Sequence, residues 1–75
     1  MTDYISDARM AELAELAADT YEFTGDWSCA FRAVTEHARD EWRCSLRRSA
    51  VLLALKLART RWLVRVQQAR AAVSA

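Results

Sequence analysis

Gly25 is the only glycine in this chain of 75 residues, and the chain contains no proline and no asparagine. A β-rich fold needs such residues at its turns, so the sequence argues against strands and hairpins. Alanine, the strongest helix former, occurs fifteen times. We therefore expect an all-α fold in which Gly25, as a residue suited to end a helix, marks the one clear break.

Apolar residues recur at the three- and four-residue spacing of helices and predict a small three-helix bundle. Its expected helices cover about residues 3–23, about 27–40 and about 43–73, within a single domain over residues 1–75. Thr2, Asp3 or Ser6 is expected to cap the first helix, and Asp26 the second. A further break is expected at about residues 38–46, because one helix from Trp27 to Val73 would need a partner along most of its length.

The apolar stripes of the expected helices differ in kind. The first helix carries Met10, Leu13, Ala17 and Tyr21, and the second carries Trp27, Phe31, Val34, Ala38 and Trp42. The third helix is apolar on two sides, with Leu46, Ala50, Leu53, Leu57 and Val64 on one and Val51, Leu55, Trp62, Val66 and Val73 on the other. A helix that is apolar on two sides must be covered on both. We expect apolar surface to remain for a second copy, which would complete the bundle as a dimer, or for a partner. The alternative is that the two shorter helices straddle the long one.

Charge is strongly polarised along the chain although the net charge is only +1. The first 26 residues carry seven acids against the single base Arg9, and no acid follows Glu41. This separation predicts a protein that binds itself or another macromolecule. The expected partner-binding residues are Trp62 with the flanking Arg61 and Arg65, and a regular acidic stripe. That acidic stripe consists of Glu12, Glu15, Asp19 and Glu22.

Three interpretations of the acidic stripe remain open: a solvated helix face, pairing with the chain's own basic helix in a monomer or dimer, and mimicry of a row of phosphates. Trp62 is the tryptophan that we expect to be exposed to a partner, because tryptophan is a common interface anchor.

Nucleic-acid binding by the basic C-terminal helix is the alternative function. Its candidate residues are Arg47, Arg48, Lys56, Arg59, Arg61, Arg65 and Arg70. Such bases would neutralise phosphates, but they are divided between two strips of the helix, and the sequence pI is only about 7.8. A protein partner is therefore the first expectation.

Chemistry-bearing residues are sparse. Cys29, His37 and Cys44 match no zinc-ligand spacing, and no nucleophile is paired with a base, so we expect a non-enzymatic protein without metal or cofactor. The cysteines are expected to be reduced, and the apolar run after Ser49 is interrupted at Lys56, too early to span a bilayer. These features predict a cytoplasmic protein that does not enter a membrane.

The expected mechanism is steric occupation of a partner's surface. The alanine- and arginine-rich composition resembles that of short open reading frames of bacteria and their phages, although no motif carries the resemblance. An inhibitor encoded by a phage or mobile element, of the anti-CRISPR kind, or a small regulatory subunit would fit this size and this lack of chemistry.

Overall fold

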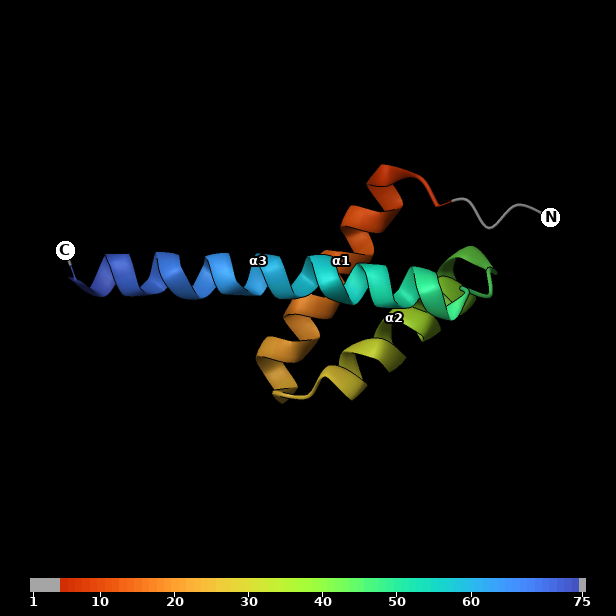
Figure 1. The fold of residues 1–75 in the computed structure, drawn as a ribbon. Helices are drawn as coiled ribbons and strands as arrows, with labels where there is room; N and C mark the ends of the chain where they lie inside the picture. The colour runs from red at the N-terminus through yellow and green to blue at the C-terminus, as the bar shows by residue number, and fades with distance from the viewer. Residues whose placement is uncertain (1–4, 75) are drawn as a thin grey trace.

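The computed structural model describes residues 5–74, and that part of the chain forms three α-helices and no strand. Helix α1 spans Asp7–Thr24, α2 spans Trp27–Trp42 and α3 spans Arg48–Ser74. The predicted all-α three-helix bundle is confirmed. Figure 1 shows α3 crossing α1 and continuing past both shorter helices toward the C-terminus.

Polar caps set the ends of the first two helices. The Ser6 hydroxyl accepts a hydrogen bond from the Arg9 backbone N–H at 3.2 Å, so α1 begins at Asp7. Of the three expected caps, Ser6 is the one that the structure supports, so α1 begins later than the outer bound of about residue 3; residues 1–4 lie outside the described range. A Ser6 cap satisfies an N–H group that would otherwise have no partner in the first turn.

The corner between α1 and α2 follows the sequence prediction. Gly25 ends α1 in the left-handed conformation, with φ of 70°, and its N–H bonds the Tyr21 carbonyl. The Asp26 carboxylate then accepts a hydrogen bond from the Ser28 N–H at 2.8 Å and caps α2. Both predictions, the glycine stop and the aspartate cap, are confirmed.

The second break lies at residues 43–47. Arg43 has φ of 52°, and its N–H bonds the Ala38 carbonyl, which closes α2. A left-handed residue cannot continue a right-handed helix. The third helix therefore starts at Arg48 and not at about residue 43 as expected, although the break overlaps the predicted interval of about 38–46.

The core is built mainly from alanine, and its largest fully buried side chains are Leu13, Val34 and Val51. The other buried residues are Ala14, Ala17, Ala18, Ala30, Ala38, Ala54 and Ala58. Half-buried aromatic and aliphatic side chains border this cluster, so the stripes predicted for α1 and α2 do face the core. Small side chains at the contacts let helix axes approach closely.

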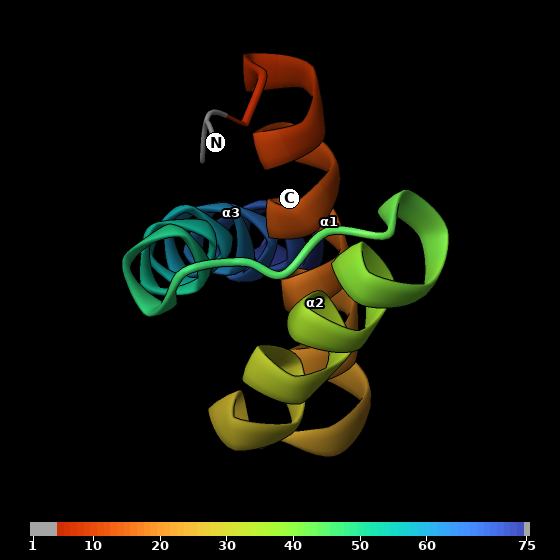
Figure 2. The same ribbon diagram turned by 90° about the vertical axis from the view of Figure 1, so that its right-hand side faces the viewer.

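Only one side of α3 is covered. In Figure 2, which looks along α3, both α1 and α2 lie to one side of it, and the described chain leaves the opposite side open. Val51 on the covered side is 1% exposed, whereas Leu53 and Leu57 on the open side are 48% and 38% exposed. The straddled arrangement is therefore wrong, and the expected surplus of apolar surface is confirmed.

Candidate functional site

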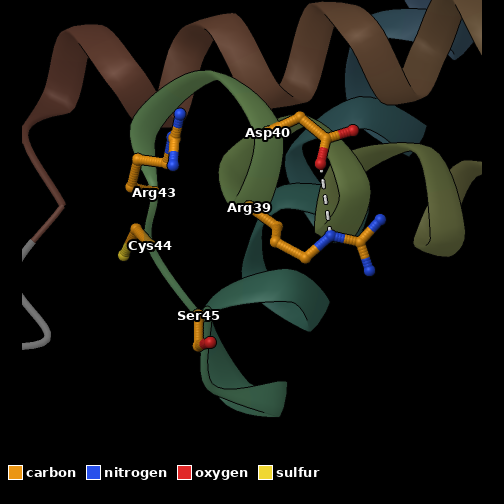
Figure 3. Close-up of a pocket in the computed structure, with 5 residues that line it drawn as sticks. All are labelled: Arg39, Asp40, Arg43, Cys44 and Ser45. Atoms are coloured by element: carbon orange, nitrogen blue, oxygen red, sulfur yellow. Dashed lines mark hydrogen bonds and ion pairs between the residues drawn. The ribbon is translucent and has the colours of Figure 1, made fainter.

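One hollow lies where α2 gives way to the connection that leads to α3. It encloses about 490 Å³ and is lined by Arg39, Asp40, Arg43, Cys44 and Ser45. Figure 3 shows Arg39 turned onto Asp40, with its Nε donating to the carboxylate at 3.2 Å. The lining carboxylate is thus engaged by a neighbouring guanidinium, and both side chains are largely exposed. Among the described residues, no hydrogen bond joins the Asp40 carboxylate to Cys44 or Ser45 in this hollow.

Residues 5–74 contain no group of three or more His, Cys, Asp or Glu side chains placed to hold a metal ion. The His37 ring instead contacts the Glu12 carboxylate on α1, with the Nε2 and Oε2 atoms 2.9 Å apart. None of the described helices combines the length and the apolarity that crossing a membrane requires.

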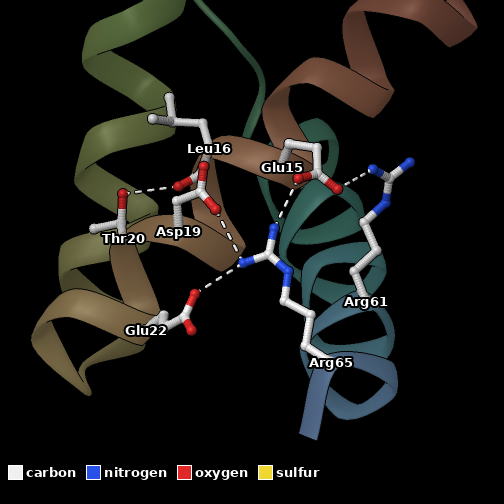
Figure 4. Close-up of polar contacts among 7 residues, drawn as sticks. All are labelled: Glu15, Leu16, Asp19, Thr20, Glu22, Arg61 and Arg65. Carbon is white, nitrogen blue, oxygen red and sulfur yellow. Dashed lines mark hydrogen bonds and ion pairs between the residues drawn. The ribbon is translucent and has the colours of Figure 1, made fainter. Parts of the chain in front are cut away.

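The most connected polar cluster joins α1 to α3 around Arg65, as Figure 4 shows. The guanidinium contacts Glu15 at 2.7 Å, Asp19 at 2.9 Å and Glu22 at 3.1 Å. Arg61 donates to the second oxygen of Glu15 at 2.6 Å. Because successive turns of α1 present these carboxylates at three- and four-residue spacing, one arginine can reach three of them.

These ion pairs favour the charged forms of Glu15 and Arg65. The hydrogen bond from Arg61, together with the charges of Arg65 and Arg61, holds the pKa of Glu15 below its ordinary value, although burial acts in the opposite direction. The hydrogen bond to Asp19 raises the pKa of Arg65, supported by the charges of all three carboxylates. Arg65 therefore stays protonated in acid, whereas Glu15 becomes neutral.

The acidic stripe is accordingly paired within the monomer. Glu12 contacts α2 through His37, while Glu15, Asp19 and Glu22 contact α3. Of the three interpretations, pairing with the chain's own basic helix is the one that the structure supports. Pairs of this exposure contribute about 0–1 kcal/mol each, so they orient α1 on α3 more than they stabilise it.

We expect Arg65→Met to lower the free energy of unfolding by about 1 kcal/mol at neutral pH and by almost nothing at about pH 2.5. Glu15 has a folded-state pKa below its ordinary value, so its stabilising contribution is present at neutral pH and is lost as the pH falls through that lowered pKa. Urea unfolding at several pH values, followed by circular dichroism, measures the difference.

Arg59→Met is the matched control, because Arg59 is exposed on the same helix and its side chain makes no ion pair within the described residues. Its unfolding free energy should follow that of the parent chain at every pH. A constant loss for Arg65→Met from neutral to acid pH would show that the guanidinium acts by packing and not by charge.

With these charges engaged, the open side of α3 carries most of the large apolar side chains that the described residues leave exposed. We call the open side of α3 the outer α3 face. Five large apolar side chains are exposed on it: Leu52, Leu53, Leu57, Leu63 and Val64. Single exposed leucines are normal on protein surfaces, whereas several large apolar side chains exposed on one side of a helix are typical of interaction sites. The chain buries alanines in its core and displays leucines on this helix.

The outer α3 face has an apolar ridge and a mixed ridge. Leu53, Leu57 and Val64 follow one another at four and seven residues and form the apolar ridge. Leu52, Lys56, Arg59, Leu63 and Arg70 form the mixed ridge. The two ridges lie about 100° apart around the helix, with Ser49 and Thr60 between them.

Trp62 does not lie on this face. It is half-buried on the covered side, where its ring meets Tyr21 edge-on with centroids 5.1 Å apart. Tyr21 in turn stacks on Trp27 at 3.9 Å, so Trp62 extends the core. Trp62 was expected to be exposed to a partner, but it is only partly accessible, because the side of α3 that carries it is the side that packs on α1.

The bases expected to bind nucleic acid are also divided by the fold. Arg61 and Arg65 face α1 and hold carboxylates, and Arg47 makes a contact of its own. The exposed bases on α3 are Arg48, Lys56, Arg59 and Arg70. The structure therefore does not bring the seven bases into one continuous track.

Sequence reasoning found the apolar side of α3 but did not select it as the site. It also left out Leu52 and Leu63. The signal that could have found the face is the position of the alanines: Ala54 and Ala58 lie on the side that meets Ala17 and Ala18 in one buried cluster. Close crossing needs small residues, so the leucine side had to face outward.

Comparison with protein-family models, with curated proteins and with solved structures finds no match to this chain.

Proposed function

We propose that the chain is a non-enzymatic protein-binding module, which acts by covering part of a partner's surface. The observation that carries the proposal is the outer α3 face, where five large apolar side chains of one helix remain between 38% and 55% exposed. Burying their exposed portions would contribute on the order of 5 kcal/mol before the costs of association.

Two biological roles follow from steric occupation. One is an inhibitor of the anti-CRISPR kind, encoded by a phage or mobile element, and the other is a small regulatory subunit. Both roles need a shaped surface and no chemistry, and the ion pairs of Arg65, which orient α1 on α3, support such a role. Cys29 and Cys44 are free thiols, which supports action in the reducing cytoplasm.

Nucleic-acid binding is the weaker candidate. Binding of a phosphate backbone requires a row of accessible arginine and lysine side chains. Two of the seven proposed basic residues are already paired with carboxylates on α1. Exposed leucines and a valine are interspersed among the others, and a phosphate backbone gains nothing from them. The outer α3 face therefore suits another protein better than it suits DNA or RNA.

The proposal is tested by placing a photo-crosslinking amino acid at Leu57 and, in a matched variant, at Arg32. Leu57 lies on the outer α3 face, whereas Arg32 is an exposed residue of α2. We expect irradiation in the native cells to give one discrete adduct with another protein from position 57 and none from position 32. The adduct should disappear when Leu53→Glu is added.

Absence of any adduct at position 57 would contradict the proposal. A product made of two copies of the chain would replace it with self-association. Circular dichroism of each variant shows whether the helices are intact, so that loss of the adduct reports the surface and not unfolding.

A further inference from the structure

We propose that the occupant of the outer α3 face is an acidic amphipathic helix of another protein. The inference rests on the proposed function and adds the charge and shape of the partner. The observation behind it is that exposed basic side chains of α3 make no ion pair within residues 5–74.

Helix α3 contains no acidic residue in its 27 positions. Lys56 and Arg59 lie between Leu52 and Leu63 on the mixed ridge, and Arg70 lies two turns beyond Leu63. All three bases are exposed, and within residues 5–74 none of their side chains makes an ion pair. The outer α3 face is thus apolar and positive at once, without any negative charge on its own helix.

The shape of the face suits a helix. The apolar ridge and the mixed ridge are separated by a strip that includes the small residues Ser49 and Thr60. Ridges of one helix pack into grooves of another, so a partner helix would lie along this strip. Apolar residues on that helix would meet Leu53, Leu57 and Val64, and acidic residues beside them would meet the bases.

A second copy of the chain is a poor occupant of the face. In a two-fold dimer the same surface patch meets itself, so Lys56, Arg59 and Arg70 would face other bases of the second α3. Glu15, Asp19 and Glu22 of α1 are held by Arg61 and Arg65, away from the outer α3 face. A head-to-tail contact that used acids of α2 would give a ring or an open chain of copies and not a two-fold dimer.

A bilayer is disfavoured by the same arrangement. The strip between the two ridges is polar, because Ser49, Thr60 and Gln67 lie there and Lys56 borders it. A membrane-surface helix buries one unbroken apolar face and keeps its charges at the edges. A partner helix, in contrast, can place a carboxylate opposite Lys56 in the middle of the contact.

The test uses two synthetic helical peptides that share leucines at helical spacing. One carries glutamate beside the leucines, and the other carries lysine at the same positions. Fluorescence anisotropy with the full chain should show binding of the acidic peptide and at least ten-fold weaker binding of the basic peptide. Affinity for the acidic peptide should fall between about 0.05 M and about 0.5 M salt, because screening weakens exposed charge pairs.

The triple variant Lys56→Glu, Arg59→Glu and Arg70→Glu should reverse the preference, so that it binds the basic peptide better. These positions are exposed, and circular dichroism checks that the helices are retained. The peptides compete in the same assay with a DNA duplex and with vesicles of phosphatidylglycerol, which should bind less tightly than the acidic peptide.

The possible results separate the two proposals. Equal binding of both peptides would overturn the acidic partner, while an adduct at position 57 would still support protein binding. Binding of neither peptide, together with that adduct, would likewise overturn the acidic helix and leave the proposed function standing. Tighter binding of DNA or vesicles than of the acidic peptide would overturn it in favour of phosphate ligands. Without any adduct at position 57, the proposed function itself fails.

Discussion

Leu13→Ala should reduce the free energy of unfolding by about 3 kcal/mol and the melting temperature by about 10–20 °C. Leu13 is fully buried and is one of the three largest side chains that the core encloses. Truncation removes three buried carbon atoms and leaves a cavity. Most of the buried neighbours are alanines, whose side chains are too short to fill it.

The size of the effect matters because the total stability of a chain of 75 residues is small. At about 0.05–0.15 kcal/mol per residue, the whole free energy of unfolding is on the order of 4–11 kcal/mol. Losing about 3 kcal/mol would therefore remove a large part of the stability. Urea unfolding followed by tryptophan fluorescence and by circular dichroism measures the loss, and coincident curves would show two-state behaviour.

Leu63→Ala is the matched control, since it makes the same chemical change on the outer α3 face. Leu63 is 55% exposed, so its truncation removes much less buried surface. We expect a loss below about 1 kcal/mol. Similar losses for the two variants would mean that the outer α3 face is covered in solution, for example by a second copy.

The sequence was sufficient to predict the number and type of the elements. Helix-forming residues fill the chain, and the one glycine lies where α1 ends, next to an aspartate that caps α2. The second break was predicted only as an interval. Its stop is Arg43, an arginine in the left-handed conformation, and no residue preference marks an arginine for that position.

The candidate site was predicted in part. Its surplus of apolar surface followed from the two-sided pattern of α3, but the side that would be covered did not. Large apolar residues such as Trp62 were expected at a partner interface, and the structure places Trp62 against Tyr21 instead. The deciding property was the small size of Ala54 and Ala58, which a count of apolar positions does not register.

The small size of the buried alanines also predicts the second large effect. Ala58→Leu should lower the free energy of unfolding by about 2–3 kcal/mol or prevent the three helices from packing together. Ala58 is fully buried in the cluster that contains Ala17 and Ala18 of α1. Three added carbon atoms have no space at such a contact, so α3 would have to move away from α1 and expose the surrounding core.

Ala71→Leu is the matched control, because it makes the same chemical change at an exposed position of the same helix. Ala71 is exposed near the C-terminal end of α3, and alanine and leucine have nearly equal helix propensities. Its unfolding curve should match that of the parent chain within about 0.5 kcal/mol. If Ala58→Leu were equally harmless, α1 and α3 would not meet through their alanines, and the leucines of α3 would have no structural reason to face outward. A clear difference between the two variants would instead tie the exposed face to the close crossing: the helices approach through their small residues, and the large ones are thereby left for a partner.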